Sequence, residues 1–246
     1  MNAPPRFSLV IPAYNEERCL PRLLDSVDEA RRRYRGGEGA IEVIVADNAS
    51  TDHTSGIARE RACQVASVEM RAIAAVRNGG ARIATGEILA FTDADMRIHP
   101  ATFDAIDEVL ATGRAVGGAT GTTMERWSLG IAMTFALMVP LVWLTGMDTG
   151  VVFCRRKDFE AIGGYDESRR VAEDVAFLLA LRRLGRTRGQ KLARANAAKT
   201  IASARKFDEY GDWHYFRLMP KLAARLLVDP RATGEFADQY WYRPKR

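Results

Sequence analysis

The first part of the chain alternates short apolar runs with segments in which apolar residues recur at helical spacing. Runs at residues 7–11, 41–46, 64–68 and 88–92 have the length of buried strands, and the segment 16–34 carries a helical stripe of leucines and Val27. We expect further helices at 54–61 and 72–84. Repeated strand, helix and strand units predict an α/β fold with a mixed, mostly parallel central sheet flanked by helices.

The order becomes less regular after residue 98. We expect helices at 100–110, 157–162 and 173–184 and strands at 115–120 and 150–154, with the helix at 173–184 largely buried.

Residues 127–147 form a run of 21 residues without a formal charge, about the length that spans a bilayer. A span would place the acidic residues before and after it on opposite sides of the membrane, and Gly130 and Pro140 weaken the pattern. We therefore expect a buried or interfacial helix.

Composition narrows the class of protein. The 36 Lys and Arg against 31 Asp and Glu leave a net charge of +5, which suits anionic small molecules or an acidic membrane surface. The sequence contains no motif of aromatic and basic residues that would indicate nucleic-acid binding. Three cysteines without metal-ligand spacing predict reduced thiols, and the N-terminal residues lack the apolar core of a signal peptide, so we expect a cytoplasmic protein.

Two aspartates, Asp93 and Asp95, follow the apolar run at 88–92. Charges at the tip of a buried strand must meet solvent, a metal or a ligand, and ligands bind at the carboxyl edge of such sheets. If strand alternation continues, both side chains point to one side and can approach one cation. Their hard oxygen ligands favour Mg²⁺ or Mn²⁺.

Two loops at the same predicted edge suit a nucleotide. Pro12-Ala13-Tyr14-Asn15-Glu16 follows the first strand, and Asp47-Asn48 follows the second. Asp or Asn side chains can read ring N–H and carbonyl groups, and a tyrosine ring supplies a wall. The alternative is that residues 50–52 merely cap the next helix, as we expect at least one of them to do.

Further residues have both a functional and a structural interpretation. Arg71 and Arg77 suit phosphate or a solvated helix face, and Asn78 with the following glycines allows a close backbone approach. Glu173-Asp174 begins a helix, where the dipole favours negative charge. The pair could supply a general base or simply cap the helix.

Together these segments resemble a family 2 glycosyltransferase with the nucleotide-diphospho-sugar transferase (GT-A) fold. The resemblance rests on several stretches within about residues 7–210: Val10-Ile-Pro-Ala-Tyr-Asn-Glu-Glu17, Val43-Ile-Val-Ala-Asp-Asn-Ala-Ser-Thr-Asp52, residues 77–95 ending in Asp93-Ala94-Asp95, Phe159-Glu-Ala-Ile-Gly-Gly-Tyr-Asp-Glu167, and Glu173-Asp174. It implies one domain over 1–228, with a nucleotide-binding half (1–98) and an acceptor half (99–228), followed by a basic aromatic tail (229–246).

The resemblance also implies roles for matched residues. Asp174 would be the catalytic base beside Glu173, and Asp95 with Asp93 would hold the metal. The donor would contact a larger set: Pro12, Ala13, Tyr14, Asn15, Glu16, Asp47, Asn48, Arg71, Arg77, Asn78, Asp93, Ala94 and Arg205. The family often has two adjacent aspartates where this chain has Asp47-Asn48, so which of the two reads the base stays open.

The implied reaction is inverting transfer of one sugar from a UDP, GDP or dTDP donor to an acceptor hydroxyl. The chain lacks the Gln-x-x-Arg-Trp signature of processive synthases. The acceptor could be a sugar or a lipid-linked or cell-envelope glycan. Residues 127–147 and the basic stretch 182–194 could border the inner face of the plasma membrane, or the apolar run could be a core helix or a homodimer surface.

Two other functions remain open. A nucleotidylyltransferase shares such a sheet and metal site but would release pyrophosphate, and a non-catalytic protein could bind a nucleotide-sugar without turnover.

Overall fold

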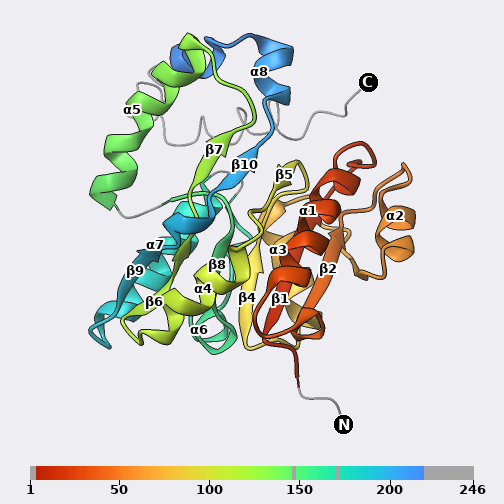
Figure 1. Ribbon diagram of the computed structural model, residues 1–246, viewed down its shortest axis with the longest axis vertical. Helices are drawn as coiled ribbons and strands as arrows, with labels where there is room; N and C mark the ends of the chain where they lie inside the picture. Colours follow the sequence, from red (N-terminus) through yellow and green to blue (C-terminus); the bar gives the residue numbers. More distant parts are fainter. Residues whose placement is uncertain (1–3, 146–147, 170–171, 219–246) are drawn as a thin grey trace.

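The computed structural model describes residues 4–145, 148–169 and 172–218. Its centre is a seven-stranded sheet of order β3-β2-β1-β4-β8-β6-β9 (Figure 1). The strands are β1 (Phe7–Ala13), β2 (Ile41–Asp47), β3 (Gln64–Ser67), β4 (Ile88–Phe91), β6 (Ala115–Ala119), β8 (Val152–Arg155) and β9 (Lys191–Arg194). Only β8 runs antiparallel to its neighbours β4 and β6, so the sheet is mixed and mostly parallel, as predicted.

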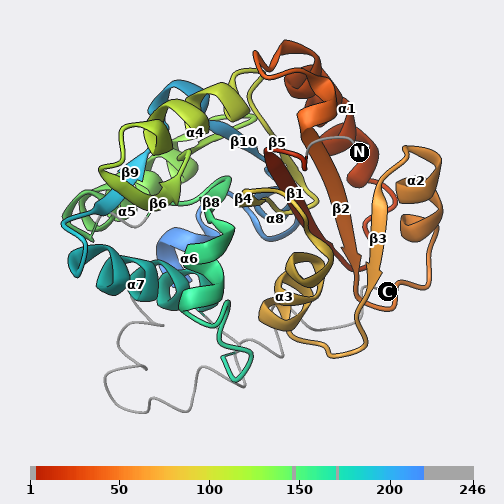
Figure 2. The same ribbon diagram turned by 90° about the horizontal axis from the view of Figure 1, so that it is seen from below.

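Helices cover both faces of this sheet (Figure 2). One face carries α1 (Leu20–Arg33) and α4 (Thr102–Ala111), and the other carries α3 (Ile73–Ile83), α6 (Arg156–Ala161) and α7 (Glu173–Arg186). The short α2 (Thr54–Glu60) packs beside α1, β2 and β3, and two 3-10 turns lie at Glu38–Ala40 and Asn196–Ala198.

Strand alternation creates the two cores. In β1, Phe7, Leu9 and Ile11 point into the core beneath α1 and α4, whereas Val10 points into the core beneath α3 and α7. All seven residues of β1 are buried because the strand lies in the middle of the sheet with both faces covered. The buried face of α7 consists of Phe177, Leu178 and Leu181, so this helix buries one face rather than most of its surface.

β1 extends further than the sequence predicted. It continues through Pro12 to Ala13, which pairs with Asp47 of β2. Its pairing with β4 stops at Val10 and Phe91, so the missing N–H of Pro12 lies beyond the last residue of β4 and interrupts no ladder. Pro12 and Ala13 are therefore strand residues at the carboxyl edge, not loop residues.

A small second sheet was not predicted. It has the order β5-β10-β7, formed by β5 (Met96–Arg97), β10 (Thr200–Ala202) and β7 (Thr122–Met124), and it is followed by α8 (Arg205–Tyr210). The sheet joins the residues directly after Asp95 to a segment about a hundred residues later. It thereby carries the end of the described chain back to the carboxyl edge of β1 and β4.

The uncharged run contains α5 (Leu129–Thr145), which stands at one end of the molecule with β7 and α8 (Figure 1). Its described part is not a core helix. Ile131 is buried in a small cluster with Met124, Ala204 and Phe207, whereas Leu129 is 71% exposed. Among the described residues, none of the helices has both the length and the hydropathy needed to cross a bilayer. The predicted tail at 229–246 lies outside the described residues.

Candidate active site

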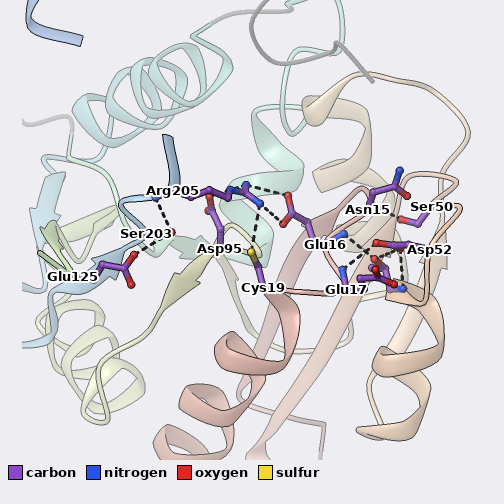
Figure 3. Close-up of polar contacts among 11 residues, drawn as sticks. Asn15, Glu16, Glu17, Cys19, Ser50, Asp52, Asp95, Glu125, Ser203 and Arg205 are labelled. Carbon is purple, nitrogen blue, oxygen red and sulfur yellow. Dashed lines mark hydrogen bonds and ion pairs between the residues drawn. The ribbon is translucent and has the colours of Figure 1, made fainter. Parts of the chain in front are cut away.

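The loops after β1 and β2 are tied to each other by hydrogen bonds (Figure 3). Asn15 adopts a left-handed backbone conformation (φ 52°), and its side-chain oxygen accepts a hydrogen bond from the N–H of Thr51 at 2.8 Å. The N–H of Asn15 donates to Ser50 at 3.0 Å. These contacts hold the loops together, so the side-chain oxygen of Asn15, predicted to bind a nucleotide, already has a structural partner.

Asp52 performs the capping predicted for residues 50–52. Its carboxylate accepts hydrogen bonds from the N–H of Thr54, the first residue of α2, and from the N–H of Glu17. Although burial opposes it, this hydrogen bonding lowers the pKa of Asp52. Asp52 is thereby fixed as a charged structural residue between the two loops.

Asp47 and Asn48 differ in what they contact. The side-chain nitrogen of Asn48 donates to the carbonyl oxygens of Val68 at 2.7 Å and Met70 at 2.9 Å, which holds the turn after β3. Asp47 is 7% exposed, and its buried Oδ1 has no hydrogen-bond partner among the described residues. Asp47 therefore offers an unpaired buried acceptor at the carboxyl edge, whereas the amide nitrogen of Asn48 already donates to two backbone carbonyls.

Tyr14 and Arg71 come together above this edge. The guanidinium carbon of Arg71 lies 4.9 Å from the centre of the Tyr14 ring, a cation–π contact between the loop after β1 and the segment before α3. Arg71 is exposed, so the contact leaves its charge accessible from solvent.

Arg77 is the electrostatic centre of the site. It is 4% exposed on α3, and its guanidinium contacts three carboxylates: Asp174 at 2.6 Å, Asp93 at 2.9 Å and Glu173 at 3.0 Å. The ring of Tyr165 lies beneath it, with the ring centre 5.2 Å from the guanidinium carbon. The alternative of a solvated helix face is wrong for Arg77, because α3 packs this side chain inward between β4 and α7.

Asn78 fixes the turn opposite α3. Its side-chain nitrogen donates to the carbonyl of Tyr165 and to Glu167, both at 2.8 Å, and its side-chain oxygen accepts the N–H of Tyr165 at 2.9 Å. We predicted Asn78 as a nucleotide-binding residue. The structure corrects this interpretation, since the buried amide is saturated by the turn at residues 163–167.

Two glycines after Asn78 serve packing against the sheet. A Cβ on Gly80 would lie 2.4 Å from Val10, and one on Gly79 would lie 2.3 Å from Val68. The sequence predicted that the backbone at these glycines approaches another group closely. In the structure, α3 approaches β1 and the turn after β3 at these positions.

The acid pair begins α7, as predicted, directly after Ala172 in a left-handed conformation (φ 58°). Burial raises the pKa of Asp174, and the neighbouring Asp93 charge adds to this effect, while Arg77 opposes it. The pKa of Glu173 is raised for the same reasons, by burial first and then by Asp174. A raised pKa brings a carboxyl closer to the range in which a general base works.

Asp93 and Asp95 do not follow strand alternation. β4 ends at Phe91, and Asp95 lies in a turn in which the N–H of Met96 donates to the carbonyl of Asp93. Asp93 contacts Arg77, whereas Asp95 contacts Arg205 at 3.2 Å, and Ala94 between them is buried. The prediction that strand geometry aligns both carboxylates is wrong, because the chain turns before Asp95.

Arg205 of α8 joins distant parts of the chain (Figure 3). Its guanidinium contacts Glu16 at 3.0 Å, Asp95 at 3.2 Å and the sulfur of Cys19 at 3.4 Å. Burial raises the pKa of Asp95, the Asp93 charge adds to this, and Arg205 opposes it. The guanidinium of Arg205 thus lies beside Asp95, which was predicted to bind a metal on the donor diphosphate.

The turn after β4, which contains Asp93 and Asp95, offers few ligands for a metal. Within the described ranges, no group of three or more His, Cys, Asp or Glu side chains is arranged to hold a metal ion. The side chains of Asp93 and Asp95 are partly accessible, at 42% and 25% exposure. Two carboxylates fit Mg²⁺ or Mn²⁺ when water and donor phosphate oxygens complete the coordination shell.

Tyr165 and Cys19 were not predicted as site residues. Tyr165 is 2% exposed and packs against Phe177 with ring centres 4.1 Å apart, so a buried aromatic supports the guanidinium of Arg77. The Gly163-Gly164-Tyr165 turn is the only sequence signal that could have indicated it. Cys19 had no such signal. It lies directly before the first turn of α1, and its sulfur contacts the guanidinium of Arg205 at 3.4 Å.

Comparison with known proteins identifies the family. The family model for glycosyl transferase family 2 matches residues 8–163, more than half of the chain. The chain belongs to this family. The match includes β1, β2, Arg77 and the Asp93-Ala94-Asp95 turn, whereas the acid pair and Arg205 lie beyond it.

Curated relatives of this family 2 chain are glycosyltransferases. Validoxylamine A glucosyltransferase of Streptomyces hygroscopicus subsp. limoneus is 34% identical over 102 residues, which cover 39% of this chain and 22% of the relative. Glycosyltransferase AglE of Haloferax volcanii is 31% identical over 138 residues, which cover 50% of this chain and 44% of AglE. The chain thus spans less than half the length of these relatives.

Solved structures show the same GT-A fold. Mannosyltransferase PcManGT from Pyrobaculum calidifontis, in complex with GDP-Man and Mn²⁺, gives a TM-score of 0.63 at 22% identity, covering 82% of this chain and 57% of PcManGT. A fragment of S. aureus TarS in complex with UDP gives 0.60 at 18% identity, covering 84% of this chain and 63% of TarS. At these identities the likeness concerns the fold, and it confirms the predicted fold class.

Proposed function

We propose that this chain is an inverting, metal-dependent glycosyltransferase that moves one sugar from a nucleotide-diphospho-sugar to an acceptor hydroxyl. The observation that carries the proposal is the position of Arg77. This buried arginine holds the acid pair Glu173-Asp174 and the donor-side Asp93 in one cluster. A carboxylate that can accept a proton and a carboxylate beside the leaving group are therefore adjacent, as a single displacement requires.

The donor base would bind between the loops after β1 and β2. The unpaired Oδ1 of Asp47 is an acceptor that a ring N–H of the base would satisfy, and Asn48 would act by holding the adjacent turn. Tyr14 and Arg71 would form the wall of this pocket, with the guanidinium available to a phosphate. Relatives of known structure contain UDP or GDP-Man, which supports a donor of this class.

Asp95 and Asp93 would hold Mg²⁺ or Mn²⁺ together with the donor diphosphate. Such an ion supplies positive charge that stabilises the leaving nucleoside diphosphate. The structure of PcManGT contains Mn²⁺, which supports this class of cofactor. Arg205 lies beside Asp95 and would add a second positive charge on the same side, provided that it turns from Glu16 toward the diphosphate.

Asp174 would accept the proton of the acceptor hydroxyl while that oxygen attacks the anomeric carbon. The new bond forms on the face opposite the nucleotide, the bond from the anomeric carbon to the phosphate oxygen breaks, and the configuration inverts. Arg77 keeps the carboxylate of Asp174 oriented, and the raised pKa of Asp174 improves its basicity.

The acceptor would be a sugar or a lipid-linked or cell-envelope glycan. Its hydroxyl must reach Asp174, whose side chain is 39% exposed at the start of α7. The exposed α5 near α8 gives a lipid-linked acceptor a surface close to the donor site.

A donor panel tests this proposal. UDP-, GDP- and dTDP-sugars are incubated with the chain and Mn²⁺, and release of nucleoside diphosphate is measured with a panel of sugar and lipid-linked acceptors. Release of pyrophosphate from a sugar phosphate and a nucleoside triphosphate would instead indicate a nucleotidylyltransferase. Donor binding without release for any acceptor would favour a non-catalytic nucleotide-sugar-binding protein.

The variant Asp174→Asn tests the assignment of the base. It should abolish transfer and keep donor binding measured by calorimetry, because the donor-side residues are unchanged. Asp25→Asn is the matched control, since Asp25 is 71% exposed on α1 and pairs with Arg61 away from the site. An Asp174→Asn enzyme with the turnover of the control would refute the assignment.

A further inference from the structure

Exposed large apolar side chains are concentrated in one part of the molecule. Of the ten in the described chain, seven lie between residues 127 and 139 or on the segment 205–217: Trp127, Leu129, Met133, Leu137, Val139, Tyr210 and Trp213. The other three, Met70, Ile83 and Val175, lie on separate elements. Single exposed apolar residues are ordinary, but a contiguous group marks an interaction surface. We call these seven residues the apolar surface.

The apolar surface is held firmly by the body of the protein. Ile131 and Phe135 of α5 pack with Phe207 and Tyr215, and Gly130 approaches the backbone of Asp212 so closely that a Cβ would lie 2.7 Å from its carbonyl oxygen. Arg126 adds an ion pair to Asp212 at 2.7 Å. The outward side of α5 is thus presented at a fixed position at one end of the molecule (Figure 1).

The outward side of α5 has the wrong polarity for contact with water. Exposed positions 129, 132, 133, 136 and 137 follow helical spacing and are leucine, alanine, methionine, alanine and leucine. No residue from 127 to 147 is charged. A surface helix normally turns charged and polar residues outward, and a helix that is apolar all round is normally buried.

We propose that the apolar surface inserts into one leaflet of an anionic lipid bilayer. Trp127, Tyr210 and Trp213 supply the amphipathic rings that favour the boundary between headgroups and acyl chains. α5 has 17 residues, fewer than the about 20 that span a bilayer, so α5 would lie in the leaflet.

The net charge of the chain suits an anionic bilayer. Asp148, three residues after α5, pairs with Arg194 of β9 at 3.2 Å. Arg194 closes the stretch 182–194, which holds six arginines and lysines and no acid, and in which Arg183, Arg186 and Lys191 are exposed. The net charge of +5 adds long-range attraction to acidic headgroups.

Vesicle flotation of the full chain tests this proposal without any need for turnover. Vesicles of phosphatidylcholine with phosphatidylglycerol should carry the wild-type chain to the top of a gradient. Raising the salt should weaken binding but not abolish it, because apolar insertion persists when charges are screened. Vesicles of phosphatidylcholine alone should bind more weakly.

Two substitutions on the outward side of α5 identify the surface. Met133→Glu with Leu137→Glu should lower the vesicle partition coefficient by at least about 100-fold, as expected when two large apolar side chains no longer leave water. Ile83→Glu is the control, since Ile83 is 39% exposed at the end of α3 and should bind as the wild type does. Unchanged circular dichroism and unfolding midpoints would show that the variants fold.

Three results would overturn the proposal. The first is a wild-type chain that stays unbound with anionic vesicles at low salt. The second is a double variant that floats as well as the wild type. The third is a wild-type dimer in solution that the double substitution dissociates while vesicles bind neither form, which would assign the surface to a second copy of this chain.

Discussion

Replacement of Arg77 by methionine tests the electrostatic centre of the site. Methionine keeps the apolar stem of the side chain but removes the guanidinium that contacts Asp174, Asp93 and Glu173. The three carboxylates would then face one another without a countercharge. The substitution should therefore alter both the stability of the fold and the titration of the proposed base.

The size of the stability effect follows from burial. Removing one partner of a buried ion pair costs about 3–5 kcal/mol. Solvent screens part of this loss, because the side chains of Asp93 and Asp174 are 42% and 39% exposed, while Glu173 is only 13% exposed. We therefore expect Arg77→Met to lower the free energy of unfolding by about 2–3 kcal/mol at pH 7.

The pH dependence of this loss has a defined sign. Without Arg77 the folded-state pKa values of Asp174 and Glu173 rise further above their unfolded values. Carboxyls with raised folded-state pKa values favour the folded state at low pH and lose this contribution as pH rises through those values. The deficit of Arg77→Met should therefore be smaller at pH 5 than at pH 8.

Urea unfolding at several pH values and the pH profile of kcat/KM measure both effects. The acidic limb of the profile should move to higher pH in Arg77→Met, since Arg77 opposes the raised pKa of Asp174. Arg82→Met is the control on the same helix. Arg82 is 66% exposed and lies 3.8 Å from Glu167, so its loss should cost less than about 0.5 kcal/mol. An Arg77→Met variant as stable as the control, with an unchanged pH profile, would refute this reasoning.

Three further predictions concern other parts of the site. In the wild type, kcat/KM should fall on acidification at a pH above the ordinary aspartate pKa, because the raised pKa of Asp174 protonates the base earlier, and a profile that stays flat down to pH 4 would contradict this. Mn²⁺ with nucleoside diphosphate should raise the thermal unfolding midpoint of the wild type but not that of Asp95→Asn, and an equal rise in both would exclude Asp95 from the metal site. Without metal at pH 7, Asp95→Asn should be no less stable than the wild type, since burial disfavours the charged form of Asp95. Asn78→Ala should cost about 2–3 kcal/mol in urea unfolding, because it leaves both the N–H and the carbonyl of Tyr165 without their partner, and a loss below about 0.5 kcal/mol would show that the turn is held by other contacts.

The sequence predicted six of the seven strands of the main sheet, because each of the six carries a recognisable run of apolar residues. β9 (Lys191–Arg194) was not predicted, since it has only two apolar residues between basic ones. β1 and β4 are continuous buried runs, and β2 is interrupted only by the partly buried Glu42. Their position inside the sheet follows from that composition. The small sheet could not be predicted in the same way. β5 has two residues, and β7 and β10 have three each, too few for a period, and their pairing depends on contacts across about a hundred residues.

The site was predicted residue by residue but not as a network. A sequence can indicate that Arg77 lies on a helix, but a buried and a solvated arginine at that position give the same pattern. Gly79 and Gly80 bring α3 so close to the sheet that the side chain of Arg77 turns toward Asp93 and the start of α7. The pairing of Arg205 with Glu16 spans 189 residues and likewise leaves no local signal.

The shared guanidinium of Arg77 places Asp93 near Asp174, which links the donor site to the protonation of the proposed base. The negative charge of Asp93 is one of the causes that raise the pKa of Asp174, so the two acids are electrically coupled. A donor complex that brings a cation to Asp93 would neutralise this charge and favour the ionised form of Asp174. The base would then lose its proton most readily once the donor is in place. Donor binding would thereby prepare Asp174 to accept the proton of the acceptor hydroxyl.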